Sequence, residues 1–389
     1  MLSFNNSKKR ISQPKAVWAV FFTAIIAFMS LGLVDPILPA IANQLGATPS
    51  EVTLLFTTYF AVTGVAMLIT GAVSSRLGIK RTMLCGVIII AVFSTLAGLS
   101  NNIWTIDGLR GVWGLGNALF VATALTSIIL ISENGVSKAV ILYEAAIGLG
   151  LSTGPLLGGL LGEISWRYPF IGVGCLMTIG FIFLFTSMPD EHESDRILRK
   201  KTSLIDPFRA LKHHSIMVLA VTAALYNFGF FTLLAYAPFI IGLDAHGIGL
   251  VFIGWGVLLA FTSVFLAPRL QRRFGMINSM CTMLTIFAVV LLIMGIYTSI
   301  QWIIILSIIF AGALIGTINT LITTAVMQAT TIERSTVSAA YSFVRFIGAA
   351  IAPYLAGVLA VIYSPHIPFI LEDALFLAPQ YLCCLIVIM

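Results

Sequence analysis

The chain has 389 residues, of which 59% are apolar and only 9% are charged, and its mean hydropathy is +1.05. A soluble domain of this size could not keep so much apolar surface away from water, and such domains usually carry far more charge. The composition excludes soluble enzymes, disordered regulators and disulfide-rich secreted domains. It predicts a helical protein that crosses a membrane many times.

Twelve apolar runs follow one another, each close to the ~20 residues that a membrane-spanning helix needs. The first six are predicted at 16–42, 52–74, 82–100, 104–131, 138–162 and 168–188. Six more are predicted at 214–241, 247–268, 276–298, 301–327, 335–362 and 367–389. The prediction is an all-α membrane protein with an N-terminal six-helix half at 1–188, a cytoplasmic linker at 189–213 and a C-terminal six-helix half at 214–389.

The positive charges indicate an orientation. If the N-terminus is cytoplasmic, 18 of the 21 Lys and Arg residues fall in cytoplasmic segments, as the positive-inside rule requires. Both termini are then cytoplasmic. The net charge of +6 is explained by this bias, so the lipid bilayer is the expected partner and nucleic acid is not.

Two short patterns recur at nearly the same spacing. Arg76-Leu-Gly78 at the end of span 2 returns 197 residues later as Arg273-Phe-Gly275 at the end of span 8. A proline and a glycine four residues apart recur in spans 5 and 11, at Pro155 and Gly159 and at Pro353 and Gly357. The sequence therefore predicts two duplicated halves, with a ligand site between them near the middle of the bilayer.

Charged residues inside spans are costly and indicate function. Asp35 lies beside Pro36 and Pro39 in span 1, and these prolines should open the helix around the acid. Arg110 lies at a similar depth in span 4. The two residues either exchange a proton against a ligand or form a permanent ion pair. Alternatively, Asp35 lies at the outer interface of the membrane.

Two more charges lie deeper. Glu144 in span 5 can be a proton relay, a carboxylate that binds cations or an interface residue, and the sequence does not distinguish these roles. Arg345 lies ~10 residues into span 11, deep enough to require a partner. The sequence does not identify that partner, so the role of Arg345 stays unknown.

Span 5 is rich in glycine between Gly148 and Gly159. No strand precedes this segment and no GK[ST] motif follows it, which excludes a phosphate-binding loop. Small residues four apart in an apolar helix indicate close helix contact. We expect a tight, hinge-like interface between the two halves, formed by Gly150, Gly154, Pro155, Gly158 and Gly159. The scattered cysteines and histidines have no metal-site spacing, so neither a metal nor a cofactor is expected.

Four of these segments together resemble the motifs of a known family. They are Asp35-Pro36-x-x-Pro39 in span 1, the 71–81 loop between spans 2 and 3, Arg110 with Gly114 in span 4, and the glycine-rich 148–159 segment. Over essentially its whole length the chain resembles the major facilitator superfamily, and within it the twelve-span drug:proton antiporters of the multidrug efflux type.

This resemblance implies a secondary transporter, not an enzyme, in a bacterial cytoplasmic (inner) membrane. It would export small lipophilic or cationic compounds in exchange for protons by alternating access. Asp35 and Arg110 would couple transport to protons, with Glu144 as a second protonatable site. A cytoplasmic conformational latch would comprise Gly71, Ser75, Arg76, Gly78, Lys80 and Arg81. The family usually has an acid where Ser75 stands, so the charge pairing of the latch should be weaker here.

Substrate contacts are predicted from aromatic and amide side chains on spans expected to line the cavity. These are Tyr59, Trp113, Tyr226, Asn227, Phe230 and Tyr236; lipid-facing or packing roles are the alternative for each. A dedicated exporter of one metabolite, such as a sugar or siderophore, and a lipid flippase are the alternative functions. The expected partners are a small-molecule substrate and protons, and the expected oligomeric state is a monomer.

Overall fold

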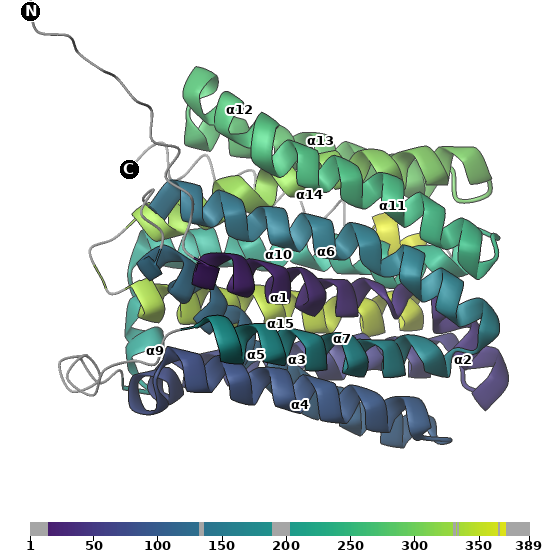
Figure 1. Cartoon of the computed structure of the whole chain (residues 1–389). Coiled ribbons are helices and arrows are strands. Elements are labelled where there is room, and N and C mark those ends of the chain that lie inside the picture. The colour runs from purple at the N-terminus through teal and green to yellow at the C-terminus, as the bar shows by residue number, and fades with distance from the viewer. Residues whose placement is uncertain are drawn as a thin grey trace, which may run out of the picture.

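The computed structural model of the chain describes residues 15–131, 136–188, 203–329, 332, 334–364 and 366–370 (Figure 1). In this part of the chain, eleven helices are long and apolar enough to cross a membrane. The all-α membrane fold class is confirmed. The first part of the predicted linker, at 189–202, and the predicted twelfth span from residue 371 onward lie outside the described residues.

The N-terminal group of helices comprises α1 to α7. Their bounds are α1 (Lys15–Gly32), η1 (Asp35–Ile37), α2 (Leu38–Leu45), α3 (Pro49–Leu77), α4 (Ile79–Leu99), α5 (Ile103–Ile131), α6 (Val136–Ile164) and α7 (Arg167–Ser187). The first predicted span is broken at η1, where Pro36 and Pro39 cannot donate backbone hydrogen bonds. Gly46 then ends α2 with a left-handed φ of 64°, which glycine adopts without steric cost.

The C-terminal group comprises α10 to α15, preceded by a short helix. The bounds are α9 (Asp206–Ala210), α10 (His214–Ile240), α11 (Ala245–Phe261), η2 (Thr262–Leu266), α12 (Ala267–Phe274), α13 (Met276–Ile296), α14 (Gln301–Gln328) and α15 (Arg334–Ile362). The η2 segment is a π-helical turn within the predicted eighth span. The hydroxyls of Thr262 and Ser263 there donate to the carbonyl oxygens of Ala313 and Gly316 on α14, at 2.8 and 3.0 Å.

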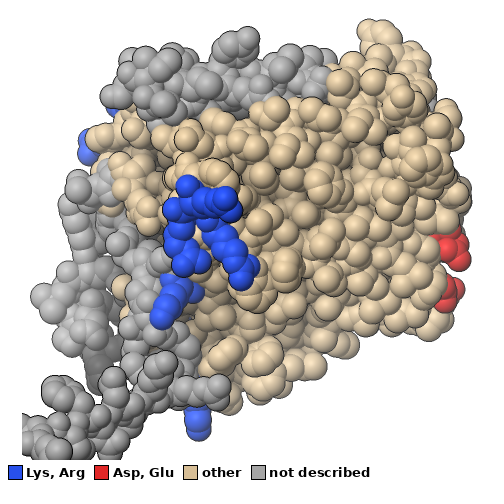
Figure 2. All heavy atoms as spheres, turned by 90° about the horizontal axis from the view of Figure 1, so that it is seen from above, with Lys and Arg blue, Asp and Glu red and all other residues tan. Residues whose placement is uncertain are grey.

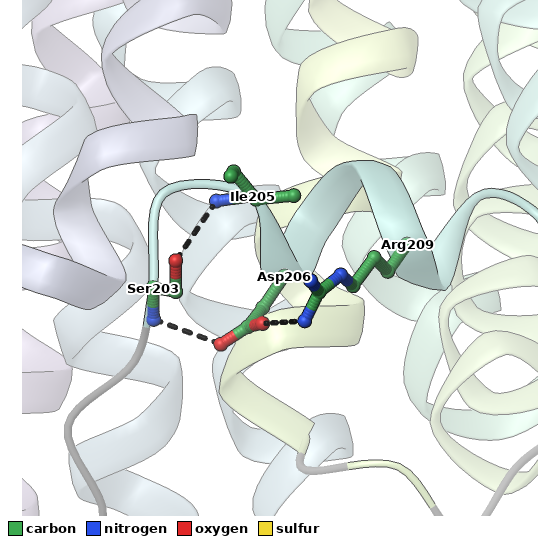
Figure 3. Close-up of polar contacts among 4 residues, drawn as sticks. All are labelled: Ser203, Ile205, Asp206 and Arg209. Carbon is green, nitrogen blue, oxygen red and sulfur yellow. Dashed lines mark hydrogen bonds and ion pairs between the residues drawn. The ribbon is translucent and has the colours of Figure 1, made fainter.

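The described end of the predicted linker is fixed to the bundle by α9. Asp206 begins this helix and accepts a 2.8 Å hydrogen bond from the backbone N–H of Ser203, while Arg209 lies 3.7 Å from the same carboxylate (Figure 3). Pro207 and Ala210 are buried, because α9 packs on α15. Residues 203–213 therefore form a short ordered segment that leads directly into α10.

The two turns that carry the Arg-x-Gly pattern have the same backbone geometry. Gly78 joins α3 to α4 with φ 89° and ψ 159°, and Gly275 joins α12 to α13 with φ 82° and ψ 166°. At both turns a hydroxyl four residues later donates to the glycine carbonyl oxygen at 2.7 Å, from Thr82 and from Ser279. This correspondence supports the predicted internal repeat.

Consecutive long helices run in opposite directions, so the turns alternate between the two ends of the bundle (Figure 1). The end with the α2–α3 turn is called the Gly46 end, and the end with the α3–α4 turn the Gly78 end. On the face shown in Figure 2, Lys and Arg gather toward the end where α12 lies, which is the Gly78 end, and Asp and Glu lie at the opposite end. The described surface charge is therefore unequal between the two ends.

The most extensive contacts between the two groups are α3 with α15 and α6 with α11. On the first interface, Cβ atoms built on Gly64 and Gly357 would lie 3.2 Å from Phe346 Cβ and 3.3 Å from Ser50 Cα. On the second, a Cβ built on Gly148 would lie 2.7 Å from the Cα of Ala260. Both interfaces run from the middle of the bundle toward the Gly46 end.

Candidate functional site

A buried carboxylate connects the two groups of helices near the middle of the bundle. Glu144 on α6 is 1% exposed, and its Oε2 accepts a 2.6 Å hydrogen bond from Nδ2 of Asn319 on α14. The Oδ1 of Asn319 accepts a 2.5 Å hydrogen bond from the hydroxyl of Tyr226 on α10. One N-terminal helix and two C-terminal helices thus share a single polar chain.

Glu144 and Arg345 line the same cavity, which has a volume of about 30 Å³. Glu144 lines it from α6 and Arg345 from α15, so two opposite charges share one cavity. Leu125, Met327 and Ser338 also line the cavity, which therefore extends toward the Gly78 end. Among the described residues that line this cavity, Glu144 is the acidic one, and it is therefore the candidate partner that Arg345 requires.

Several polar atoms around this cavity lack partners. The unpartnered atoms are Glu144 Oε1, Thr323 Oγ1, Tyr341 Oη and Arg345 Nε, each without a hydrogen bond to any described residue. Aromatic rings on its own helix hold the Arg345 guanidinium, whose carbon lies 5.6 Å from the centre of Phe346 and 6.0 Å from that of Tyr341. A buried polar atom without a partner is costly, so this cavity is suited to a polar ligand or to water.

Arg110 lies in a second, separate cluster. Its side chain is fully buried, and its Nε donates a 3.2 Å hydrogen bond to the carbonyl oxygen of Leu55. The guanidinium carbon lies 4.7 Å from the ring centre of Trp113 and 5.0 Å from that of Tyr59. Two predicted substrate residues, Tyr59 and Trp113, therefore contact the predicted proton-coupling arginine.

The backbone of Asp35 lies in η1, but its side chain is outside the described part of the structure. Its pairing with Arg110 stays a prediction. The sequence analysis missed Asp107, which lies one turn before Arg110 on α5 and accepts a 2.5 Å hydrogen bond from the hydroxyl of Thr58. The spacing of three residues from Arg110 could have identified it, because residues i and i+3 share one helix face.

The predicted latch surrounds the α3–α4 turn, and its polar side chains have different environments. Lys80 is 8% exposed, and its Nζ donates a 2.6 Å hydrogen bond to the carbonyl oxygen of Met188, just after α7. The Ser75 hydroxyl donates to the Ala72 carbonyl of its own helix at 3.0 Å. Arg76 and Arg81 are exposed. Of these two hydrogen bonds, the one from Lys80 joins α4 to the residue that follows α7, within the N-terminal group.

The glycine-rich face of α6 does not contact the partner that the sequence analysis expected. Cβ atoms built on Gly150 and Gly154 would lie 2.5 Å from the carbonyl oxygens of Ile25 and Met29 on α1, and one built on Gly158 would overlap the Leu33 carbonyl. For these three glycines the expectation of a contact between the halves was wrong, because α1 belongs to the same N-terminal group.

A neighbouring face of α6 makes the contact between the groups. A Cβ built on Gly256 of α11 would overlap Ser152, and one built on Gly249 would lie 2.8 Å from the Pro155 carbonyl oxygen. Pro155 also contacts α1, because a Cβ built on Gly32 would lie 2.7 Å from its Cδ. Gly159 is buried on α6. Helix α6 is thus held between α1 and α11.

The other predicted substrate residues lie on α10. Tyr226 belongs to the Glu144 chain, whereas Asn227 donates to the Ala223 carbonyl of its own helix at 2.8 Å. Phe230 stacks on Trp255 with ring centres 5.6 Å apart, and Tyr236 lies 5.9 Å from Phe369 by the same measure. None of the six predicted residues lines the cavity described above.

Comparison with known proteins identifies the family. The model of the Major Facilitator Superfamily matches residues 20–353. The chain belongs to this superfamily. The family match confirms the predicted resemblance and makes the chain a membrane transporter by family. The bundle and its two helix groups are therefore those of a major facilitator.

Two relatives and one solved structure extend the comparison. The chain is 52% identical to the multidrug efflux protein YfmO of Bacillus subtilis over 365 residues, covering 94% of this chain and 91% of that protein. It is 23% identical to the quinolone resistance protein NorA of Staphylococcus aureus over 293 residues, covering 74% of this chain and 75% of that protein. The human organic anion transporter MFSD10 (TETRAN) has a TM-score of 0.74 at 17% identity, covering 95% and 99% of the two chains, and shows the shared fold.

Proposed function

We propose that this major facilitator exports small organic compounds of the multidrug type in exchange for protons. The observation that carries the proposal is the buried polar cavity between the two groups of helices, where Glu144 of one group meets Asn319 and Arg345 of the other. The name of the relative that is 52% identical supports multidrug export. The family supports a transport function.

Alternating access gives this cavity its role. In the proposal, residues 1–188 and 214–389 move as two halves about the ligand. Their contacts run along α3–α15 and α6–α11 toward the Gly46 end, and the cavity lies on the Gly78 side of these contacts. With the Gly78 end cytoplasmic, as the lysines and arginines indicate, this arrangement corresponds to a state closed toward the outside.

Proton coupling is assigned to carboxylates within the membrane. Glu144 is a candidate because its carboxylate is buried and its hydrogen bond to Asn319 crosses between the groups. Protonation removes its charge and thereby weakens that bond, since hydrogen bonds to ionised acceptors are stronger than neutral ones. Asp35, with Arg110 on α5, is the second candidate. In both cases a proton would replace the interaction that a substrate uses.

The 71–81 segment acts as a conformational latch at the cytoplasmic end, where Lys80 ties α4 to the end of α7. The chain functions as a monomer in a bacterial cytoplasmic membrane, with both termini in the cytoplasm. The bacterial origin of the YfmO relative supports this membrane.

The test is dye transport in inverted membrane vesicles that contain the full chain. Ethidium uptake should require a proton gradient and should be abolished by an uncoupler. Asp35→Asn and Glu144→Gln should each be compared with wild type under both conditions. Loss of uptake with either substitution assigns proton coupling to that carboxylate.

Glu163→Gln is the matched control, because Glu163 lies on the same helix as Glu144 and is half exposed. Its uptake should equal that of wild type. Uptake that persists with the uncoupler would refute proton coupling. Vesicles that take up no dye but move a labelled lipid or a single metabolite would refute multidrug export and favour a flippase or a dedicated exporter.

A further inference from the structure

The cavity between the groups contains two opposite charges that do not neutralise each other directly. Glu144 lies on α6 and Arg345 on α15, and no ion pair within 4 Å joins these two described residues. Each retains a buried atom without a hydrogen bond, Oε1 on the acid and Nε on the arginine. Two residues of opposite charge therefore line one cavity from different helix groups.

The other oxygen of Glu144 is already occupied. Asn319 donates to Oε2, which leaves Oε1 to receive a donor from a ligand. The hydroxyls of Thr323 and Tyr341 are also without partners and line the same cavity. The polar lining can thus bind both a positive and a negative group at the same time.

The rest of the wall is apolar. Phe28, Val121, Leu125, Ile147, Met327 and Phe346 line it together with the polar residues. A ligand that fits this lining has an apolar body next to its charged groups. The described volume of about 30 Å³ is far below the roughly 300–1,000 Å³ of pockets that enclose a drug-sized ligand. The apolar body must therefore enter when the helix groups move apart.

We propose that this cavity selects amphipathic zwitterions, compounds with a carboxylate and an amine beside an apolar body, over compounds that carry only a positive charge. The inference rests on the proposed transport function and names the substrate class for that site. It differs from the expectation of lipophilic or cationic compounds, which rested on the family resemblance and on the aromatic side chains.

The fixed charge of Arg345 is the physical reason. An arginine keeps its proton in proteins, so a monocation that binds Glu144 is repelled by the guanidinium across the cavity. A zwitterion avoids this repulsion, because its carboxylate accepts from the guanidinium while its ammonium donates to Oε1 of Glu144. Hydrogen bonds between charged groups of this kind are roughly twice as strong as neutral ones.

Three probes that share one body test the proposal. Nε-dansyl-lysine is a zwitterion, dansylcadaverine is the same molecule without the carboxylate, and Nα-acetyl-Nε-dansyl-lysine lacks the charged amine. Their binding to the purified full chain in lipid nanodiscs is followed by dansyl fluorescence. Wild type should bind the zwitterion at least tenfold more tightly than dansylcadaverine and more tightly than the acetylated anion.

Two substitutions then separate the charges. Arg345→Gln should abolish the preference for the zwitterion over dansylcadaverine, and Arg345→Lys should keep part of it. Glu144→Gln should remove the preference over the acetylated anion. Arg209→Gln, at an exposed position of α9, is the control and should leave all three affinities unchanged.

Equal or tighter binding of dansylcadaverine by wild type would overturn the proposal, and this comparison needs no variant. A preference that survives in folded Arg345→Gln would also overturn it. Failure of proton-coupled transport is a distinct result, since these affinities are measured without a gradient. If inverted vesicles take up ethidium in a gradient-dependent way but the purified protein does not prefer the zwitterion, the transport proposal stands and the zwitterion proposal is refuted.

Discussion

Asn319 holds the Glu144 carboxylate and the Tyr226 hydroxyl with the two ends of one side-chain amide. The amide nitrogen donates to Glu144 at 2.6 Å and the amide oxygen accepts from Tyr226 at 2.5 Å. This arrangement fixes the orientation of the amide, because reversing it would place the amide oxygen against the Glu144 carboxylate, which has no proton to donate when ionised. Any motion that separates α6 from α14 must break the bond to Glu144.

Replacing Asn319 with leucine should destabilise the protein. The change keeps the branched shape and the number of side-chain heavy atoms but leaves the Tyr226 hydroxyl and Oε2 of Glu144 buried without partners, at a cost of about 1–3 kcal/mol for each group. The thermal unfolding midpoint of the purified protein should fall. Asn278→Leu, at an exposed position on α13, should leave the midpoint nearly unchanged. Equal midpoints for the two variants would contradict the role given to Asn319.

Gly158→Ala should be strongly destabilising because of the close approach of α6 to α1. The added methyl would overlap the carbonyl oxygen of Leu33, and a backbone atom cannot move aside as a flexible side chain can. Gly108→Ala is the matched change, since a Cβ there meets nothing within 4 Å and alanine favours a helix over glycine by ~1 kcal/mol. Expression level and thermal midpoint should fall for Gly158→Ala and stay the same or rise for Gly108→Ala. The reverse order would refute the packing argument.

Lys80→Met should loosen the end of α7. The substitution keeps most of the aliphatic side chain but removes the Nζ that donates to the Met188 carbonyl, and a hydrogen bond from a charged donor is worth about 1.5–3 kcal/mol. Hydrogen exchange at residues 184–188 should become faster. Arg81→Met, at the exposed neighbouring position, should change this exchange little. If both variants exchanged alike, the bond from Lys80 would have no stabilising role.

Ser75→Asp should change the balance between the two access states. The Ser75 hydroxyl bonds only within α3 among the described residues, whereas an acid there could pair with the nearby arginines of the latch. Spin labels at the exposed positions 101 and 299, on opposite helix groups at the Gly46 end, report the state ratio as a distance distribution. The longer distance, which belongs to the state open toward the outside, should become more populated. Ser75→Asn controls for size, and an unchanged ratio in Ser75→Asp would show that the residue at position 75 does not set this balance.

Much of the helix layout follows from the sequence because the bilayer imposes length and hydropathy on each span. The predicted runs at 104–131 and 301–327 correspond to α5 (Ile103–Ile131) and α14 (Gln301–Gln328). The π turn at η2 was not foreseen. The hydroxyls of this turn bond to α14, and local hydropathy does not reveal such a contact between helices.

The site was predictable in its residues but not in its pairings. Glu144 and Arg345 were identified because charges in spans are rare, yet they are about 200 residues apart and only the packing of α6 near α15 brings them to one cavity. Asn319 was missed, since an amide in an apolar helix has no recurring spacing. The glycine stripe predicted close packing correctly and its partner wrongly, because i, i+4 spacing identifies a face and not the helix that covers it.

The π turn has a mechanical consequence. In the N-terminal group, α3 runs from Pro49 to Leu77 without interruption, whereas its counterpart is divided into α11, η2 and α12. A π turn shifts the register of the backbone ladder and is a common place for a helix to bend. The repeated units are therefore unequal in stiffness. When the transporter rocks, bending is expected to concentrate at Thr262 in one unit while α3 behaves as a rigid lever in the other.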